Sequence, residues 1–546
     1  MQHNQHIAEL GPRLHLLGIR QVVICPGSRN APLTQLFTAD KHYSCHSIVD
    51  ERSAGFVALG MARELGEPVA VVTTSGTAVL NLAPALAEAF HQNIPLVALT
   101  ADRPLEVIPR FNNQWLDQEA PYYTFSKGFL QLPGEVTQRE EMEQMMVLVE
   151  RLVCSASESP AGPVHINVTL AEPLYDKLPA PMLEKGMPVP GKRMAEVRQE
   201  TDEAHFPEVT AGPDRKLLVL AGMGSPNEPV REKLERLLHC RQAAVVAENI
   251  ANLPGEGFCA NPDLILAGTG EKEREKLRPD LVISFGGQVV SKRLKLFLQS
   301  RPDLKHTEIT GDVLSFMERL TGQDPPGEGF RNRYQEAWDS AGSAVLARAR
   351  KKMDALAFCN LSVTDRILSA LPEDAVLHLG NSGAIRYSQL SPRRTAQHCY
   401  ANRGTSGIDG CVSTAVGAAM VSGRMHVLLV GDLSFVYDSN AMWNRNFPEN
   451  LRIVVINDGG GGIFRLLDGP DKMDFFEEFS VTHHPVSLEM LGQSFGRVVR
   501  RAAGFQELEQ ELADLLQPGS TGSVLEVDTS GSENSLIFKD YLDFNH

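Results

Sequence analysis

Met425–Phe435 reads MHVLLVGDLSF, an apolar run typical of a buried strand, and it contains Gly431 and Asp432 near its end. A second run of this kind, Leu451–Asp458 (LRIVVIND), also ends in an acidic residue and is followed by four glycines. Strands buried on both faces are typical of parallel sheets covered by helices, and ligands of such sheets bind beyond the carboxyl ends of the strands. Carboxylates at that edge suit Mg²⁺, whose other ligands are phosphate oxygens and water, and glycines let backbone amides approach a phosphate. The competing interpretation is a pair of ordinary strand-end turns in which Asp and Gly serve only turn geometry.

The same alternation of short apolar runs and helical stretches extends through the whole chain. Strands are predicted in three series, which are Gln21–Cys25, Val69–Thr73, Pro95–Thr100 and Val164–Val168; then a run from Leu217 and Leu281–Phe285; then Ala375–Leu379, Met425–Val430, Leu451–Ile456 and Ser523–Val527. Stretches rich in Pro and Gly separate the series at 173–190 and near Gly322, and a helix is predicted at Tyr334–Leu356. We therefore predict an α/β fold of three domains, 1–180, 195–335 and 355–546, each a parallel sheet covered by helices.

Composition narrows the class of protein. The chain has 546 residues and a net charge of -16, which argues against a nucleic-acid-binding surface, and its short basic cluster at 348–352 is interpreted as a solvated helix face. The eight cysteines are scattered without a C-x-x-C pair, a pattern that fits a reducing cytoplasm and neither zinc nor a disulfide framework. The N-terminus lacks the apolar core of a signal peptide, and no apolar run is long enough to span a membrane. We expect a cytoplasmic protein.

A second candidate site lies in the first series. Val49–Ala54 reads VDERSA and precedes a helical stretch, so that Glu51 falls in the first turn of the predicted helix. Taken alone, a glutamate at this place is most often a capping residue that interacts with the helix dipole. The VDERSA turn and the GDL…ND pair together resemble the thiamine-diphosphate-dependent enzyme family, in which the second pattern reads GDG followed by NN.

The family resemblance implies cofactors and roles. Glu51 would hydrogen-bond the aminopyrimidine ring of thiamine diphosphate, and Ile408 would be the apolar wedge that bends this cofactor. Asp432, Asp458 and Gly460 would hold Mg²⁺, or Mn²⁺ in its place, and Ile463 and Phe464 would form apolar walls of the site. The competing interpretation of Ile408 is an ordinary core residue, because a buried isoleucine most often has that role.

Further blocks narrow the resemblance within this family. They are CPGSRNAPLT at 25–34, TSGTAV at 74–79, TADRP at 100–104, GNSGAIR at 380–386 and NRGTSGIDG at 402–410. Together they resemble the thiamine-diphosphate enzymes of menaquinone biosynthesis that join 2-oxoglutarate to isochorismate. The activity implied is a transferase reaction: 2-oxoglutarate is decarboxylated, and the remaining succinyl unit adds in 1,4-fashion to isochorismate.

Basic residues in these blocks agree with two dicarboxylate substrates, because an arginine fork is the natural partner of a carboxylate. The resemblance places Ser382 and Arg386 at 2-oxoglutarate and Arg403 close to the reacting centre, as a catalytic residue with Glu51 and Ile408. The residues implied at isochorismate are Ser28, Arg29, Arg103, Asn113, Gln114 and Lys292. For any single arginine of the set, the competing interpretation is a solvated surface residue.

The chain departs from the family pattern at two places: Asp458 stands where the family has asparagine, and the RFNN loop before Gln114 differs. In the family the glutamate and the metal site meet across a subunit interface, so a homodimer is the expected minimum and a homotetramer is compatible. Two alternatives remain. One is another thiamine-diphosphate carboligase or 2-oxo acid decarboxylase, whose pockets would be more apolar. The other is a catalytically silent α/β scaffold, against which Glu51, Asp432 and Ile408 argue.

Overall fold

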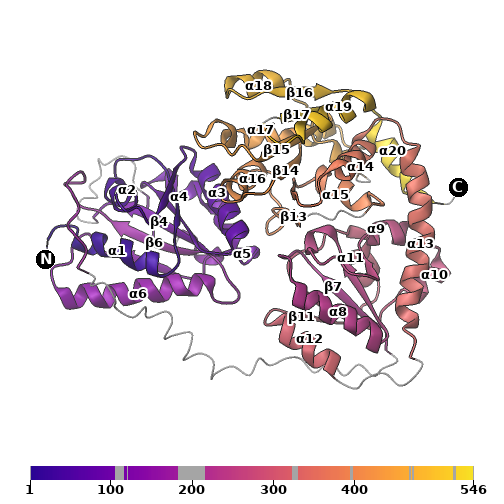
Figure 1. The fold of residues 1–546 in the computed structure, drawn as a ribbon, viewed down its shortest axis with the longest axis horizontal. Helices are drawn as coiled ribbons and strands as arrows, with labels where there is room; N and C mark the ends of the chain where they lie inside the picture. The colour runs from indigo at the N-terminus through magenta and orange to yellow at the C-terminus, as the bar shows by residue number, and fades with distance from the viewer. Residues whose placement is uncertain are drawn as a thin grey trace. The chain divides into compact units, whose positions relative to one another are not determined.

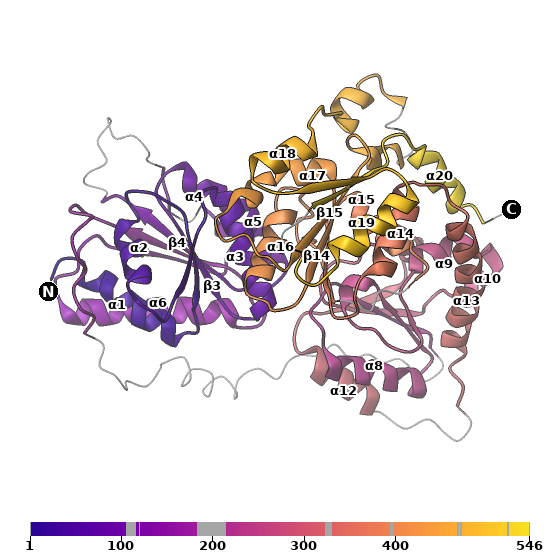
Figure 2. The ribbon, with the colours of Figure 1, turned by 45° about the horizontal axis from the view of Figure 1, so that its top comes forward.

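Parallel sheets covered by helices confirm the predicted α/β fold class (Figures 1 and 2). The computed structural model describes residues 2–104, 116–119, 121–182, 215–322, 330–393, 398–466, 469, 472–520 and 524–544. The chain divides into two compact units. Unit 1 comprises Met1–Glu203, Gly404–Gly423 and Asp438–Pro448, and unit 2 comprises Ala204–Arg403, Arg424–Tyr437 and Glu449–His546.

Unit 1 is built on a six-stranded parallel sheet of order β2-β1-β3-β4-β6-β5. Its strands are β1 (Gln21–Ile24), β2 (Ser44–Ser47), β3 (Val69–Thr73), β4 (Leu96–Asp102), β5 (Phe129–Leu132) and β6 (Val164–Thr169). One face shares an apolar cluster with α1 (Gln5–Leu16), α2 (Ala31–Thr38) and α6 (Arg139–Ser157). Alternate strand residues such as Val23 and Val71 are fully buried on the opposite face, against which α3 (Glu51–Leu65) packs. The short helices α4 (Thr77–Asn81) and α5 (Ala83–His91) precede β4.

Helix α16 (Cys411–Met420) belongs to unit 1 and packs along α3 (Figures 1 and 2). The two backbones touch. A Cβ atom on Gly60 of α3 would lie 2.0 Å from the carbonyl oxygen of Thr414, and one on Gly417 of α16 would lie 2.0 Å from that of Val57. Because only glycine permits such an approach, this pair of helices has one close-packed arrangement.

Unit 2 contains a five-stranded parallel sheet of order β11-β10-β7-β8-β9. Its strands are β7 (Leu217–Ala221), β8 (Ala243–Ala247), β9 (Phe258–Cys259), β10 (Leu281–Phe285) and β11 (Lys305–Ile309). One apolar cluster joins the sheet to α8 (Glu228–Cys240) and α12 (Val313–Gly322). A second joins its other face to α9 (Pro262–Gly268), α11 (Lys292–Gln299) and α13 (Arg333–Asp354). Helix α10 (Glu271–Lys276) lies between α9 and β10 in the chain.

The second sheet of unit 2 has six parallel strands in the order β13-β12-β14-β15-β17-β16. They are β12 (Val376–Leu379), β13 (His398–Tyr400), β14 (His426–Gly431), β15 (Leu451–Asn457), β16 (Val499–Ala502) and β17 (Val524–Asp528). An apolar cluster joins this sheet to α14 (Asn360–Ala370), α15 (Gly383–Leu390) and α19 (Phe505–Leu515). The remaining helices are α17 (Asp432–Tyr437), α18 (Leu488–Ser494) and α20 (Asn534–Tyr541). Strands β14 and β15 are neighbours, which brings the GDL and ND motifs to one edge.

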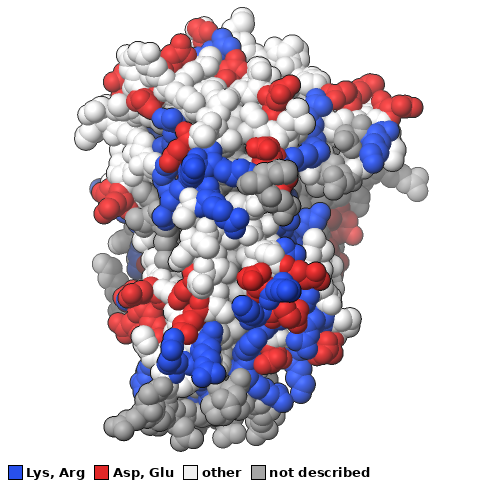
Figure 3. Space-filling view, turned by 90° about the vertical axis from the view of Figure 1, so that its right-hand side faces the viewer, with Lys and Arg blue, Asp and Glu red and all other residues white. Residues whose placement is uncertain are grey.

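The predicted strands and helix, the basic cluster and the cysteines can all be located in the structure. The ten predicted strands are present, the predicted helix at Tyr334–Leu356 is α13, and the boundaries of the three domains remain a prediction. The basic cluster at 348–352 lies on α13 with Arg348, Arg350 and Lys351 exposed, and Figure 3 shows basic side chains interspersed with acidic ones on this side. All eight cysteines are free. In the described ranges, no helix is long and apolar enough to cross a membrane.

Candidate active site

The carboxyl ends of β14 and β15 form the first part of the candidate site. Asp432, only 2% exposed, begins α17 directly after β14, and its Oδ2 accepts hydrogen bonds from the amides of Gly459 (3.1 Å) and Gly460 (2.9 Å). Asp458 follows β15, and its Oδ2 accepts a hydrogen bond of 2.8 Å from Asn360 Nδ2. The structure therefore brings together the two predicted metal-binding carboxylates and the glycine run.

The glycine turn after β15 leaves no room for a side chain at its centre. Gly460 has a φ of 147°, and a Cβ atom there would lie 2.6 Å from the carbonyl oxygen of Val481. Only glycine adopts this backbone conformation without strain. The glycine run is therefore required by the geometry of the turn after Asp458. This requirement is separate from the approach of backbone amides to a phosphate.

Two neighbours of the carboxylates were not predicted from the sequence. His484 Nε2 lies 3.2 Å from Asp432 Oδ2, although the histidines lack metal-binding spacing. Asn360 comes from the first turn of α14, almost one hundred positions before Asp458 in the printed sequence. Neither residue belongs to a recognisable block, so that only the tertiary fold reveals them.

The predicted 2-oxoglutarate residues lie at the start of α15, in the GNSGAIR block. Ser382 occupies the N-cap position of α15, without a capping hydrogen bond from its side chain, and has a φ of 72°, a strained conformation for a residue other than glycine and one that is concentrated at functional sites. Arg386 Nη1 donates a hydrogen bond of 2.7 Å to the carbonyl oxygen of Ser382. Arg403 Nη1 donates one of 3.2 Å to Asn381 Oδ1, and Asn381 Nδ2 donates one of 2.6 Å to the carbonyl oxygen of Asn402. A buried asparagine therefore connects the two blocks that carry these arginines.

Lys295 adds a third positive charge to this group. It is half-buried on α11, and burial lowers its pKa; the charges of Arg403 and Arg386 lower it further, while Glu248 opposes them. Lys292, the predicted substrate residue of α11, is exposed one helical turn away. Lys295 was missed because the family blocks contribute only SKRL here.

In unit 1, Glu51 is the first residue of α3. The N-cap is Asp50, whose carboxylate accepts hydrogen bonds from the amides of Arg52 (2.9 Å) and Ser53 (3.2 Å). Capping is therefore done by Asp50, and Glu51 is left half-buried with Asn81 Nδ2 3.5 Å from its Oε2. The structure therefore assigns the cap to Asp50, while Glu51 keeps a first-turn position in which the helix dipole favours a carboxylate.

The predicted isochorismate residues that the structure describes include a pair of arginines in unit 1. Arg29 Nη1 donates a hydrogen bond of 3.0 Å to the carbonyl oxygen of Leu170, and its Nη2 lies 3.2 Å from Glu172 Oε1. Burial lowers the pKa of Arg29, and the nearby charge of Arg103 acts in the same direction. Ser28 beside Arg29 is exposed. Asn113 and Gln114 lie outside the described residues.

The three predicted apolar residues differ in exposure. Ile408 and Ile463 are half-buried, and Phe464 is 40% exposed. Ile408 belongs to unit 1, two positions before Gly410, while Ile463 and Phe464 follow the glycine turn of unit 2 in a 3-10 helix, Gly462–Leu466. Partial exposure distinguishes all three from core residues, as expected of side chains that contact a ligand.

Comparison with known proteins identifies the family of the chain. Residues 7–121 match the family described as thiamine pyrophosphate enzyme, N-terminal TPP binding domain. A protein of Desulfotalea psychrophila is 38% identical over 92% of this chain and 94% of its own length, and one of Flavobacterium johnsoniae is 33% identical over 96% of each. Both are called 2-succinyl-5-enolpyruvyl-6-hydroxy-3-cyclohexene-1-carboxylate synthase. The chain belongs to this synthase family.

Family membership confirms the resemblance inferred from the sequence blocks. The described residues also fit the metal ion that the family implies. Burial raises the pKa of Asp432 to about 6 with a further contribution from the charge of Asp458, and burial raises the pKa of Asp458 as well. A divalent cation between the carboxylates would remove this repulsion.

Carboxylate oxygens suit a hard divalent cation such as Mg²⁺, or Mn²⁺ in its place. Across the described ranges, no three His, Cys, Asp or Glu side chains gather as a metal-binding group. Mg²⁺ is usually held by one or two carboxylates together with phosphate oxygens and water, which matches a pair of aspartates beside a phosphate-accommodating turn.

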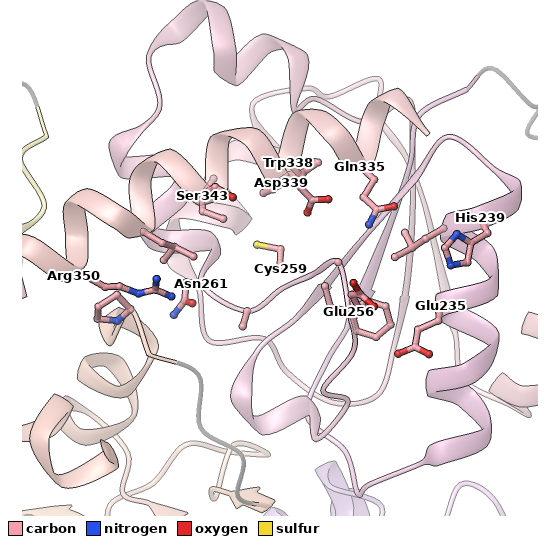
Figure 4. Close-up of a pocket in the computed structure, with 18 residues that line it drawn as sticks. Glu235, His239, Glu256, Cys259, Asn261, Gln335, Trp338, Asp339, Ser343 and Arg350 are labelled. Carbon is pink, nitrogen blue, oxygen red and sulfur yellow. The ribbon is translucent and has the colours of Figure 1, made fainter. Parts of the chain in front are cut away.

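A cavity elsewhere in unit 2 does not belong to the synthase site. It has a volume of 590 Å³ and lies beside α8, β9 and α13, as Figure 4 shows. Its lining mixes acidic residues such as Glu256 and Asp339 with Arg350 and apolar side chains, and it includes none of the predicted site residues. The site is therefore identified by its chemistry, independently of this hollow.

Proposed function

We propose that this chain decarboxylates 2-oxoglutarate with thiamine diphosphate and Mg²⁺ and transfers the succinyl unit to isochorismate by 1,4-addition. The product would be 2-succinyl-5-enolpyruvyl-6-hydroxy-3-cyclohexene-1-carboxylate, in menaquinone biosynthesis. The relatives' shared name supports this reaction. The observation that carries the proposal is the pair of carboxylates, Asp432 and Asp458, beside the glycine turn on the edge where an α/β sheet binds ligands.

The cofactor and the residues of the chain would contribute different parts of the reaction. Bound thiamine diphosphate supplies the electron sink that decarboxylation of a 2-oxo acid requires. Glu51 would share a proton with a ring nitrogen of the aminopyrimidine, because Asp50 caps the helix and the Glu51 carboxylate is available for that task. Asp432, Asp458 and Gly460 would hold the Mg²⁺–diphosphate group, Ile408 would be the apolar wedge that bends the cofactor, and Ile463 and Phe464 would form apolar walls of the site.

Charge in the described residues favours dicarboxylate substrates over pyruvate. In unit 2, Arg403 and Arg386 lie near enough to Lys295 for their charges to lower its pKa, against the opposite effect of Glu248 and Asp263. A cluster of cations is costly without an anion, and an arginine fork binds a carboxylate with two parallel hydrogen bonds. Ser382 and Arg386 bind 2-oxoglutarate with Arg403 at the reacting centre, while Lys292 and the arginine pair of unit 1 bind isochorismate.

The deciding experiment measures the mass of the product. The protein with thiamine diphosphate and Mg²⁺ is incubated with 2-oxoglutarate and isochorismate, and the expected product has the mass of both substrates combined less CO₂. Pyruvate in place of 2-oxoglutarate should give little CO₂. Faster CO₂ release from pyruvate would point to another carboligase or decarboxylase, and absence of calorimetric binding of thiamine diphosphate with Mg²⁺ would point to a silent scaffold.

Assembly and location complete the proposal. We infer a homodimer as the minimum active form, with a homotetramer as a compatible assembly, because the family resemblance implies a site shared between subunits. A cytoplasmic location remains a prediction from the scattered cysteines and the polar N-terminus.

A further inference from the structure

Glu88 on α5 is a buried carboxylate that has no part in the proposed function. It is only 1% exposed, and it accepts hydrogen bonds from two consecutive amides of a distant segment: Oε1 accepts one of 2.7 Å from Gly404, and Oε2 accepts one of 2.6 Å from Thr405. Thr405 Oγ1 donates a further hydrogen bond of 2.6 Å to Oε2, and Gln92 Nε2 donates one to Oε1. Burial of a carboxylate is costly unless its oxygens are hydrogen-bonded, and here each oxygen accepts two hydrogen bonds.

The backbone at Gly404 also packs directly against α5. A Cβ atom on Gly404 would lie 2.8 Å from the carbonyl oxygen of Glu88 and 3.1 Å from its Oε1. Because a residue with a side chain could not approach α5 so closely, glycine is required here. Close packing and hydrogen bonds to one carboxylate therefore fix the start of this segment on α5.

The anchored segment, residues 404–410, carries a residue that is assigned to the cofactor. It belongs to unit 1, as Glu88 does, and it forms neither helix nor strand. Ser406 has a φ of 64°, and such strained backbone persists only where the surrounding structure determines it, as at functional sites. Ile408 lies two positions after Ser406. The place of Ile408 therefore depends on the contacts that anchor the segment.

We propose that Glu88 is a positioning residue, which anchors Gly404 and Thr405 on α5 and thereby holds Ile408 against thiamine diphosphate. This inference rests on the proposed function, because it takes from it the contact of Ile408 with the cofactor. The anchor lies within one chain and does not involve Glu51, which by the family resemblance serves the cofactor of another subunit. Glu88 itself contacts neither substrate nor cofactor in this scheme.

The choice of a carboxylate supports this role. A carboxylate accepts hydrogen bonds at both oxygens, so that one side chain can hold two consecutive amides and a hydroxyl group. Hydrogen bonds to an ionised acceptor are about twice as strong as those between neutral groups. A fully satisfied buried network of this kind fixes one arrangement of the segments that it joins.

The first variant of the test is Glu88→Gln. The glutamine can accept hydrogen bonds only at its carbonyl oxygen, and its NH₂ group would face a backbone N–H. In the protein without cofactor, amide hydrogen exchange at residues 404–410 should therefore increase. With saturating thiamine diphosphate and Mg²⁺, deuterium exchange at the thiazolium C2 carbon should fall about 10- to 100-fold, as expected for a small misplacement of a group that contacts the cofactor.

A double-mutant cycle with Ile408→Ala separates positioning from a general effect on stability. Ile408→Ala removes the side chain that Glu88 is proposed to hold, and it should itself lower C2 exchange on the order of 100-fold. Glu88→Gln added to Ile408→Ala should then change C2 exchange by less than about twofold, because no wedge is left to misplace. A purely structural role for Glu88 would give the same loss with and without Ile408.

Glu150→Gln is the matched control, because Glu150 is a buried carboxylate of unit 1 whose Oε1 lies 2.6 Å from Arg13 Nη1. This variant should lower the melting temperature but leave both C2 exchange and amide exchange at 404–410 unchanged. Equal losses of C2 exchange in Glu150→Gln and Glu88→Gln would overturn the proposal.

Gly404→Ala provides a second route if Glu88→Gln does not fold. Its methyl group would lie 2.8 Å from the carbonyl oxygen of Glu88 and must move the segment away from α5, so C2 exchange should again fall. Wild-type C2 exchange in either folded variant, or equal losses from Glu88→Gln with and without Ile408, would refute the role of Glu88. Wild-type exchange in Ile408→Ala would instead show that the proposed function assigns Ile408 wrongly, and this inference would fail with that assignment.

Discussion

Arg386 is a side chain whose role can be separated from that of the fold. It lies in the first half of α15 and makes one hydrogen bond to the backbone of Ser382, which leaves further N–H groups of the guanidinium for a ligand. Arg386→Ala should raise the KM for 2-oxoglutarate by roughly 10- to 100-fold, the value of a charge-assisted hydrogen bond, with little change for isochorismate. Steady-state kinetics in each substrate measures the difference. Arg366→Ala, which removes a half-buried arginine paired with Glu509, is the control, and an equal loss for both substrates would refute the assignment.

Asp458 is where this chain leaves the family pattern, and the structure gives it a buried neighbour of like charge. Asp458→Asn removes one negative charge, which should weaken Mg²⁺ binding and tighten thiamine diphosphate at saturating metal, each by about tenfold. The asparagine oxygen can still accept the hydrogen bond from Asn360, so that activity should persist. Titration of Mg²⁺ at fixed cofactor, and of cofactor at high Mg²⁺, tests both signs. Exposed Asp374→Asn serves as the control, and superimposable curves for the wild type and Asp458→Asn would place the side chain outside the metal's ligands.

Motif residues could be predicted individually, whereas the side chains that support them could not. Asp432 and Asp458 follow strands, and their strand-end position is visible in one dimension. His484 reaches Asp432, and Lys295 comes near Arg386 and Arg403, from segments whose sequence carries no comparable signal. Their contribution depends on distance in the folded chain, which spacing along the sequence does not encode.

The contact between α3 and α16 joins two elements through their backbones. A methyl group on Gly417 would lie 2.0 Å from the carbonyl oxygen of Val57, so Gly417→Ala must separate the helices. We expect a loss of roughly 1–3 kcal/mol in the free energy of unfolding, as for other over-packed cores. Gly423→Ala, in the same unit but with no atom within 4 Å of the new methyl group, should leave stability unchanged. Thermal unfolding of both variants decides the matter, and a Gly417→Ala protein as stable as wild type would contradict the close contact.

Glu248 joins β8 to the loop before α11, and it makes unit 2 sensitive to pH. Its carboxylate accepts hydrogen bonds from the amides of Val290 (2.5 Å) and Ser291 (2.8 Å), yet burial raises its pKa to about 7. The folded state therefore keeps a proton that the unfolded state loses near pH 4.5, and stability falls as the pH rises between these values. The whole change is on the order of 3 kcal/mol.

Glu248→Gln should remove this part of the pH dependence. The melting temperature of the variant relative to wild type is then expected to rise between pH 5 and pH 8, because only the wild type has the Glu248 carboxyl group to ionise over that range. Exposed Glu271→Gln on α10 should follow the wild-type curve. A constant difference between Glu248→Gln and wild type would mean that Glu248 is already ionised at pH 5.

Buried central strands could be predicted from the sequence, whereas edge strands could not. Long, mainly apolar runs such as Leu451–Asn457 identify central strands, because a strand buried on both faces needs a predominantly apolar sequence. Edge strands such as β2, with the sequence SCHS, carry no such pattern, and they become strands through pairing with a neighbour. The inclusion of α16 in unit 1 was likewise hidden, because helix contacts at glycines leave no periodic signal in one chain segment.

At the level of the whole molecule, the proposed reaction needs residues of both units, since Glu51 belongs to unit 1 and Asp432 to unit 2. The family resemblance implies that the glutamate of one subunit serves the metal site of another. Glu51→Gln and Asp432→Ala should each be inactive alone, but a mixed dimer would then contain one site with both native residues and one site with neither.

Subunit exchange between these two inactive variants tests the assembly directly. Random exchange of equal amounts makes about half of the dimers mixed, and each mixed dimer has one intact site of two, so about a quarter of wild-type activity should return. The activity should appear with the kinetics of exchange and should require both proteins. Two preparations of Glu51→Gln, mixed and treated identically, are the control and should stay inactive. No recovery after mass spectrometry has verified mixed dimers would show that each site is completed within one chain, because a site of that kind always retains one of the two substitutions.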